Sequence, residues 1–375
     1  MTINNEHNKL NVPNLRFKEF SEEWKKCTLG DVSEFSKERV NTQNLSSDNY
    51  VATENMLQDY QGIIEASSFP TNTNVIKFNK GDVLLSNIRP YLKKVWFAEK
   101  NGGCSADVFV FKALSACIPD FLHYIIANDR FINFAMSGAK GVKMPRGDKE
   151  QMKTYKIGLP SIEEQKKIAK LLSLLDERIA TQNKVIYKLQ SLIKGISSKI
   201  FASIQGIEYR MGDIASITNG NSNVQDAVAE PNDGLYPFFD RSEDIKYLST
   251  FLFDKEAIIY PGEGAEFIPR YFKGKFALHQ RCYAIFDFNE IINAQYLYFY
   301  LKTQNSYFVR NAVGSTVPSL RLDTFQKLKV VVPPKEIQYS VSLCLSLMEQ
   351  KFKVENEILQ NLLKQKQYLL RQMFI

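Results

Sequence analysis

Residues 160–201 read PSIEEQKKIAKLLSLLDERIATQNKVIYKLQSLIKGISSKIF. Apolar side chains recur along this stretch at alternating spacings of four and three residues, with one polar exception. This heptad spacing is typical of a helix that packs along a seam against another helix, so the stretch predicts one long helix of a coiled coil. The seam positions are Ile168, Leu172, Leu175, Ile179, Gln182, Ile186, Leu189, Ile193, Ile196 and Ile200.

The start of this predicted helix carries its own signal. Ser161 follows Pro160, and Glu164 stands three residues after the serine, which is the spacing of a capping box. We therefore expect Glu163 and Glu164 to cap the helix rather than to act in catalysis. A helix of about 40 residues would be about 60 Å long, because each residue adds about 1.5 Å.

The same pattern occurs a second time. Residues 141–201 align without a gap with residues 314–374, at a constant offset of 173, and Gln165 matches Gln338 in this frame. We therefore expect an internal repeat with two long helices. The second seam consists of Val341, Leu345, Met348, Phe352, Glu355, Leu359, Leu362, Lys366, Leu369 and Met373.

One polar position interrupts both seams. Gln182 and Glu355 occupy the same heptad position near the middle of each predicted helix. In an antiparallel pair with opposed midpoints, they would lie in adjacent layers and fix the register of the helices. Alternatively, each side chain reaches solvent at the edge of the seam, and the sequence leaves both interpretations open.

The composition bounds the class of protein. The 375 residues are 44% hydrophobic and 24% charged, which is typical of a folded globular chain with room for two cores. The chain has no apolar run long enough for a membrane span, and its first residues lack the apolar core of a signal peptide. We therefore expect a cytoplasmic protein with no membrane partner. The net charge of +7 suits a polyanionic partner without proving one.

Metal and enzyme chemistry are not expected. The five cysteines include no CxxC pair, and none of the three histidines stands at metal-ligand spacing. The sequence also lacks a GxxxxGK[ST] loop, a GxSxG elbow and the Asn-Pro-Pro-aromatic tetrapeptide of amino-methyltransferases. The chain is therefore expected to be non-catalytic, with no metal ion and no cofactor of its own.

A folded block precedes each predicted long helix. We expect an N-terminal segment at residues 1–24, folded domains at 25–160 and 204–333, and long helices at 161–203 and 334–375. Apolar runs between glycines and prolines predict strands. They are expected at 75–78, 82–86, 107–111, 155–159, 256–260, 282–286 and 328–332, with short helices at 121–133 and 295–303.

Two basic loops of the first block are candidates for DNA contacts. The loop 86–94 interleaves basic residues with an asparagine and a tyrosine, and the loop 139–146 combines basic residues with a glycine. Such residues bind phosphates and base edges. The alternative is a solvated charged hairpin for 86–94 and a merely structural loop for 139–146. The candidates are Asn87, Arg89, Tyr91, Lys93, Lys94, Lys140, Lys143 and Arg146.

The second block has comparable candidates. Residues 269–275, leading to 279–281, are taken as the counterpart of the loop 86–94, and residues 313–321 align with 140–148. The alternative is again a solvated charged hairpin for 269–281 and a merely structural loop for 313–321. The candidates are Arg270, Tyr271, Lys273, Lys275, Gln280, Arg281, Ser315, Thr316, Ser319 and Arg321.

Two further stretches carry a family resemblance. Residues 14–24 read Asn-Leu-Arg-Phe-Lys-Glu-Phe-Ser-Glu-Glu-Trp, followed by Leu-Gly-Asp at 29–31. Residues 158–168 read Gly-Leu-Pro-Ser-Ile-Glu-Glu-Gln-Lys-Lys-Ile and open the first long helix, with an echo after Pro333 that keeps Gln338 but not the Glu-Glu pair. Over essentially its whole length, the chain resembles the DNA-specificity subunit of type I restriction-modification systems.

The resemblance implies an α+β fold, in which two similar α/β target-recognition domains are separated by two long antiparallel coiled-coil helices in a pseudo-twofold internal repeat. Each domain would read half of a bipartite, asymmetric double-stranded DNA site, and the helices would set the spacer. The implied partners are two modification subunits, which carry S-adenosylmethionine, and two restriction subunits, which use ATP and Mg²⁺. The alternative is a non-enzymatic coiled-coil scaffold that binds only proteins.

Overall fold

The computed structural model describes residues 11–141 and 143–375. Residues 1–10 of the predicted N-terminal segment and Val142 of the predicted loop 139–146 lie outside the described part. The chain divides into two compact units: residues 11–181 together with Leu359–Ile375 form the first, and Gln182–Ile358 forms the second. Each long helix therefore contributes one part to each unit.

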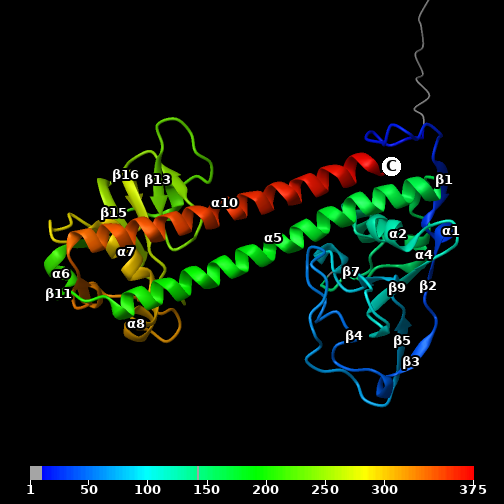
Figure 1. Cartoon of the computed structure of the whole chain (residues 1–375), viewed down its shortest axis with the longest axis horizontal. Helices are drawn as coiled ribbons and strands as arrows, with labels where there is room; N and C mark the ends of the chain where they lie inside the picture. Colours follow the sequence, from blue (N-terminus) through cyan, green and yellow to red (C-terminus); the bar gives the residue numbers. More distant parts are fainter. Residues whose placement is uncertain (1–10, 142) are drawn as a thin grey trace, which may run out of the picture. The chain divides into compact units, whose positions relative to one another are not determined.

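Two long helices carry the heptad seams. Helix α5 spans Ile162–Ser203 and helix α10 spans Lys335–Met373 (Figure 1). Every seam position on both helices is buried or half-buried. The predicted α+β fold with a long central helix and a long C-terminal helix is thus confirmed.

In the first unit the two helices are antiparallel. Asp176 of α5 forms an ion pair with Lys366 of α10, with 2.5 Å between the carboxylate oxygen and Nζ. Ile168, which lies earlier on α5, shares a core with Met373, which lies later on α10. Contacts that move back along one helix as they move forward along the other define an antiparallel pair.

The second unit shows the same direction. Gln182 of α5 donates a hydrogen bond to Glu355 of α10, while Phe201, later on α5, and Val341, earlier on α10, pack against the same core. The helices are therefore antiparallel in this unit as well. Glu355 is buried, so its side chain does not simply extend into solvent. The predicted role of the pair in fixing the register stays a prediction.

The capping box predicted at the start of α5 is half wrong. Ser161 caps as expected, because its Oγ accepts the backbone N–H of Glu164 at 3.3 Å. The Glu164 carboxylate, however, accepts two bonds from the Arg16 guanidinium at 2.7 and 2.8 Å and one from Trp24 Nε1 at 3.1 Å. Only 1% of Glu164 is exposed, so this carboxylate anchors the segment before β1 to the helix.

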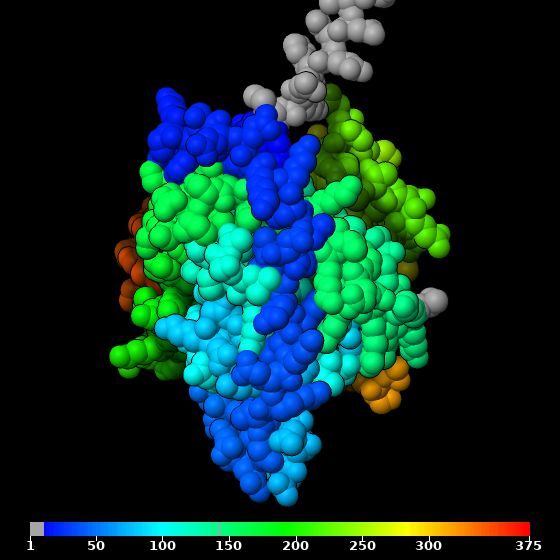
Figure 2. Space-filling view, turned by 90° about the vertical axis from the view of Figure 1, so that its right-hand side faces the viewer, coloured from blue at the N-terminus to red at the C-terminus, as the bar shows by residue number. Residues whose placement is uncertain are grey.

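This N-terminal segment covers part of the first unit. Figure 2 shows the described chain from residue 11 onward, in blue, as a continuous strip on one face of that unit. Trp24 inserts its ring into the core, edge-on to Phe121 at 6.4 Å between ring centroids. The backbone N–H of Leu15 also donates to the Gln372 carbonyl at 3.0 Å, which ties the strip to α10.

The first unit contains three sheets. A two-stranded ribbon pairs β1 with β10, and two four-stranded sheets have the orders β2-β9-β6-β7 and β3-β5-β8-β4. The strands are β1 (Lys25–Thr28), β2 (Ser33–Phe35), β3 (Arg39–Asn41), β4 (Tyr50–Val51), β5 (Asn74–Phe78), β6 (Val83–Ser86), β7 (Val95–Phe97), β8 (Gly102–Cys104), β9 (Val108–Ala113) and β10 (Lys156–Leu159).

The second unit repeats this plan in a larger sheet. Strand β11 pairs with β18, and a six-stranded sheet has the order β12-β17-β15-β16-β13-β14. The strands are β11 (Ile207–Arg210), β12 (Ser216–Asn219), β13 (Tyr236–Phe239), β14 (Lys246–Leu248), β15 (Phe253–Pro261), β16 (Arg270–Leu278), β17 (Cys282–Phe286) and β18 (Lys329–Val332).

The sheet register corrects one predicted equivalence. The order β2-β9-β6-β7 matches β12-β17-β15-β16, so β6 corresponds to β15 and β7 to β16. The loop 86–94 after β6 therefore corresponds to residues 261–269 after β15, and not to 269–275, which begin the next strand. The sequence could not show this, because the two copies differ in length and composition before the aligned stretch.

The short helices complete each unit. The helix expected at 121–133 is two helices, because Asn128 interrupts it and caps the second one by accepting the Arg130 N–H at 3.0 Å. The helices are α1 (Leu29–Val32), α2 (Pro119–Ile126), α3 (Asp129–Ser137), α4 (Lys149–Lys153), α6 (Met211–Ile214), α7 (Ala294–Lys302), α8 (Asn305–Asn311) and α9 (Leu322–Gln326), with single 3₁₀ turns at Thr42–Asn44, Pro90–Leu92 and Val224–Asp226.

A buried glutamine joins each domain to its long helix. Gln165 accepts the Ile118 N–H at 2.9 Å and donates to two carbonyls at 3.0 Å. Gln338 makes the same three bonds in the second unit, where it accepts the Asn293 N–H at 2.7 Å and donates at 2.8 Å. Both amides are fully buried and fully satisfied, which fixes the angle at which each helix leaves its domain.

Candidate nucleic-acid interface

Backbone hydrogen bonds bring the two predicted loops of the first unit together. The Arg89 N–H donates to the Pro145 carbonyl at 2.8 Å, and the Gly147 N–H donates to the Asn87 carbonyl at 3.2 Å. The Asn87 N–H in turn donates to the Asp107 carbonyl at 2.8 Å, which adds the turn before β9. Loops that were predicted separately therefore form one surface.

A fourth segment completes this surface. The Ser105 N–H donates to the Val51 carbonyl at 2.9 Å, and Lys94 donates to the Thr53 carbonyl at 2.7 Å. We call the described parts of residues 52–55, 86–89, 105–107 and 140–147 the first loop cluster.

The second unit contains a matching arrangement. The Gly264 N–H donates to the Pro318 carbonyl at 3.0 Å, and the Leu320 N–H donates to the Gly262 carbonyl at 2.8 Å. The His279 N–H donates to the Phe239 carbonyl at 2.9 Å, as the Ser105 N–H does toward Val51 in the first unit. We call residues 240–243, 261–264, 279–281 and 313–320 the second loop cluster.

The two clusters share backbone geometry but not side chains. Arg89 and Gly264 occupy equivalent positions, and both have positive φ, at 52° and 143°. An arginine at positive φ costs about 1 kcal/mol relative to ordinary backbone, whereas glycine tolerates this region. The first unit thus keeps a charged side chain at a position where the second unit has none.

Three basic residues of the first cluster are well exposed. Arg146 is paired with Asp107 at 3.2 Å, and 57% of its side chain is exposed. Lys140 bonds to Asp148 at 2.9 Å, which lowers the pKa of that carboxyl. Lys143 is exposed on the same loop. These side chains are available to a polyanion.

Three further candidates of the first unit follow the cluster in the sequence, and they differ in whether their side chains are already bonded within the protein. Tyr91 is exposed, whereas Lys93 pairs with Asp129 at 2.9 Å and Lys94 is bonded to the Thr53 carbonyl. The last two therefore also stabilise the loop that carries them.

Asn87 and Arg89 show a different feature. Asn87 Oδ1 and Arg89 Nε are buried, and neither has a hydrogen-bond partner among the described residues. Buried polar atoms normally find partners. These two atoms are therefore available to a group that enters the cluster.

The candidates of the second unit also include exposed side chains. Arg281 pairs with Glu263 at 2.6 Å, yet 62% of its side chain remains exposed. Gln280 is also exposed, as is Arg321, which directly follows the cluster in the sequence. Ser319 lies in the cluster, where its backbone pairs with Val313. Ser315 and Thr316 are exposed on the loop between these paired residues.

Strand β16 places its candidates outside the second cluster. Tyr271 donates to Glu256 and lines a cavity of about 500 Å³ beside α10. Lys273 and Lys275 are exposed along the strand. These positions belong to a strand and not to the predicted counterpart loop.

Arg270 supports the protein backbone. Its guanidinium donates to the Ser242 carbonyl at 2.9 Å and also to the Asp240 carbonyl. Burial lowers the pKa of this arginine. Most of its donors are therefore in use within the protein, and a DNA contact by Arg270 stays a prediction.

The structure adds the segment 240–243, which the sequence analysis missed. An Asp-Arg-Ser turn follows the aromatic strand β13, and this turn signal was the only local hint. Its place in the cluster depends on the parallel pairing of β13 with β16, through Phe238 with Ala277 and Phe239 with Leu278. A parallel pairing between distant strands has no short-range signature in a sequence.

The described residues contain no group of three or more His, Cys, Asp or Glu side chains that could hold a metal ion. No helix within 11–141 and 143–375 is both long and apolar enough to cross a membrane.

A protein-family model matches both copies of the repeat. It is described as the type I restriction modification DNA specificity domain, and it matches residues 21–191 and again residues 207–364. The chain belongs to this family. The first match contains the first loop cluster and the second match contains the second, so each specificity domain has one cluster.

Curated relatives of this specificity-domain family match over part of their length. The EcoDI specificity subunit of Escherichia coli is 32% identical over 127 residues, which are 34% of this chain and 28% of the relative. The MjaVIII specificity subunit of Methanocaldococcus jannaschii is 30% identical over 185 residues, which are 48% of this chain and 42% of the relative. Each match thus spans less than half of the relative.

Solved structures share the fold. A crystal structure of a type I restriction-modification S subunit from M. genitalium has a TM-score of 0.68 and 18% identity, and the match covers 97% of this chain and 99% of the other. A chain from a study of type I system assembly and conformational transition has a TM-score of 0.57 and 19% identity, with coverage of 92% and 96%. At these identities the likeness concerns the fold alone.

Proposed function

We propose that this chain is the DNA-binding specificity subunit of a type I restriction-modification complex, and that each domain reads one half of a bipartite, asymmetric site. The observation that carries the proposal is the loop cluster common to both units. The clusters share their backbone hydrogen bonds, while Lys140 and Arg146 of the first are replaced by Val313 and Ser319 in the second. One scaffold with two sets of side chains suits a reader of two different half-sites.

The long helices suit the role of a spacer. Half-sites about one turn of DNA apart lie about 34 Å apart on the same face. Helix α5 has 42 residues and would therefore be about 63 Å long. In this proposal, helical residues inserted within 186–200 lengthen the spacer and leave both half-sites intact. An unchanged spacer, with the insert shown to be helical, would contradict the role.

The helices would also dock two modification subunits. Tyr339, Leu343 and Leu347 form an exposed apolar row at spacings of four along α10, which supports a protein-binding face. S-adenosylmethionine would belong to the modification subunits, and ATP with Mg²⁺ to two restriction subunits. The chain itself would catalyse no reaction and would act in the cytoplasm, where its DNA partner is.

The decisive experiment is methylation mapping. The chain is co-expressed with its modification subunits, and methylated adenines are mapped across a genome. Exchange of residues 25–160 for those of a relative should change one half of the recognised motif, and exchange of 204–333 should change the other half. A change in both halves from one exchange would contradict the modular proposal.

The alternative is an assembly scaffold that binds only proteins. Fluorescence anisotropy of the reconstituted complex with random duplex DNA at two salt concentrations separates the two ideas, because phosphate contacts make binding weaker at higher salt. The absence of any DNA binding would favour the scaffold. Methyl transfer from labelled S-adenosylmethionine by the isolated chain would contradict the non-catalytic role.

A further inference from the structure

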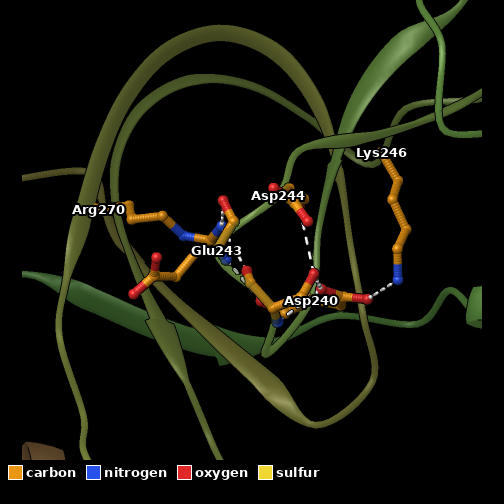
Figure 3. Close-up of polar contacts among 6 residues, drawn as sticks. Asp240, Glu243, Asp244, Lys246 and Arg270 are labelled. Atoms are coloured by element: carbon orange, nitrogen blue, oxygen red, sulfur yellow. Dashed lines mark hydrogen bonds and ion pairs between the residues drawn. The ribbon is translucent and has the colours of Figure 1, made fainter. Parts of the chain in front are cut away.

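The segment 240–243 of the second loop cluster is held by its own aspartate. Asp240 is 3% exposed, and its carboxylate accepts the Ser242 N–H at 2.8 Å and the Lys246 ammonium at 2.6 Å (Figure 3). Burial acts to raise the pKa of Asp240, but the bonds from Lys246 and Ser242 outweigh burial, and the pKa is lowered overall. The carboxylate therefore stays charged and keeps the turn closed.

Arg270 holds the same segment from the neighbouring strand. Its guanidinium donates to the carbonyls of Asp240 and Ser242, and it lies over the Phe239 ring at 5.0 Å from the ring centroid. Figure 3 shows Arg270 and Lys246 approaching the turn from different sides. The backbone on both sides of residue 241 is thus fixed by two cations and one carboxylate.

Arg241 stands between these fixed residues and is exposed. Within the described chain, no residue hydrogen bonds or forms an ion pair with its side chain. The Phe239 carbonyl accepts the His279 N–H, so Arg241 lies beside the turn that carries Arg281. Arg281 in turn pairs with Glu263 at 2.6 Å, so the turn beside Arg241 is itself tied to the segment 261–264 of the cluster.

The first loop cluster holds its equivalent segment differently. Thr53 occupies the position that matches Arg241, and its carbonyl accepts Lys94. The Thr53 hydroxyl lies 3.3 Å from the Ser86 hydroxyl, within hydrogen-bond distance. Both units therefore anchor this turn with a cation, but only the second unit presents an unpaired arginine from it.

We infer that Arg241 reads a base edge in the half-site bound by the second domain, and that Arg270, Asp240 and Lys246 position it. The inference rests on the proposed function. A guanidinium bonds guanine O6 and N7 as a bidentate pair, and this contact needs a fixed orientation. A turn held at three points supplies that orientation.

The test uses the complex reconstituted with its modification subunits and a library of duplexes that vary at each position of the motif. Arg241→Ala should relax the preference at one base pair of the second half-site by about 10-fold or more. Arg241→Lys should do the same, because lysine keeps the positive charge but lacks the planar guanidinium that can donate two parallel hydrogen bonds. The first half-site should be unchanged in both variants.

Lys255 offers a matched control. It is an exposed lysine that forms an ion pair with Asp287 at 2.5 Å. It lies near the start of β15, whereas Pro261, at the end of that strand, leads into the cluster. Lys255→Ala should leave the motif unchanged. Arg270→Lys should relax the same base pair as Arg241→Ala, to a smaller extent, and should speed hydrogen exchange in 240–246.

Three outcomes would overturn the inference. They are an unchanged motif in an active Arg241→Ala complex, weaker binding at every position alike, and faster exchange in Arg270→Lys without any change of base preference. The second outcome would indicate a phosphate contact, and the third a merely structural role for Arg270. A wild-type complex that methylates no defined motif would instead contradict the proposed function itself.

Discussion

Gln182 and Glu355 hold the same place in the two copies of the repeat, and they hydrogen bond directly to each other. The Gln182 amide donates to the Glu355 carbonyl at 2.9 Å and to its carboxylate at 2.5 Å. Equivalent residues of two antiparallel helices face each other only at the centre of the pairing. This contact therefore marks the point from which the two seams run in opposite directions.

We predict that Gln182→Leu lowers the midpoint of urea unfolding, because Glu355 then loses a donor inside the seam. Replacing both residues with leucine should restore the midpoint, since an apolar pair continues the heptad pattern. A double-mutant cycle measures the coupling between the two sites. Two single effects that simply add would show that the residues do not act as one layer.

Glu164→Gln should release the N-terminal segment from α5. The substitution leaves the Arg16 guanidinium without its buried counter-ion, which costs about 3 kcal/mol. Hydrogen exchange should become faster in residues 15–24. Glu163→Gln is the matched control, because Glu163 is its exposed neighbour. Equal exchange in the two variants would contradict an anchoring role for Glu164.

The two buried glutamines should act on different parts of the chain. Gln165→Leu and Gln338→Leu each remove three hydrogen bonds and leave buried backbone groups unpaired, at a cost of about 3 kcal/mol. Exchange should increase around Ile118 in the first variant and around Asn293 in the second. The prediction fails if either substitution loosens both regions equally.

The first unit should lose stability as the pH falls below about 6.5. Burial, and then the charge of Lys366, lowers the pKa of His123 from 6.5 to about 3. Between these values the unfolded chain binds a proton that the folded chain does not, so stability rises with pH and is about 2 kcal/mol lower at pH 5. His123→Phe should flatten this slope in thermal unfolding between pH 5 and 7. An unchanged slope would contradict an imidazole that stays neutral in the folded chain.

Arg146→Ala should weaken DNA binding by the reconstituted complex. If Arg146 meets a phosphate, the slope of log affinity against log salt should fall by about 1, equally for all sequences. If it reads a base, one position of the first half-site should relax instead. Lys156→Ala is the control, since this exposed lysine belongs to β10 and not to the loops of the cluster. Identical behaviour of the two variants would remove Arg146 from the interface.

The long helices could be predicted because their information is local. Each turn of α5 and α10 repeats the same apolar spacing, and partial burial follows that spacing along both helices. The role of Glu164 could not be predicted, because its partner Arg16 is 148 residues away and the nearby serine satisfied a familiar local pattern. Asn128 is an intermediate case, since an asparagine inside an apolar helix pattern is a recognised cap signal.

The candidate site was predictable only in part. The loop 140–147 was found because it lies in the well-aligned stretch, and its partner loop 86–89 because of its unusual mixture of charges and an aromatic ring. The counterpart of 86–89 was misplaced, since residues 261–264 carry Glu263 instead of a basic residue. Arg241 was missed because only the pairing of β13 with β16 brings it to the cluster.

The core of the first unit has a consequence for biosynthesis. Phe374 stacks on Phe121 with 5.2 Å between ring centroids, and its carbonyl accepts a bond from Arg130 at 2.8 Å. Leu370 and Met373 belong to the same core. On the ribosome this core stays incomplete until those residues emerge, whereas the second unit, an uninterrupted Gln182–Ile358, is whole earlier. The domain that is translated first is therefore the one that is finished last.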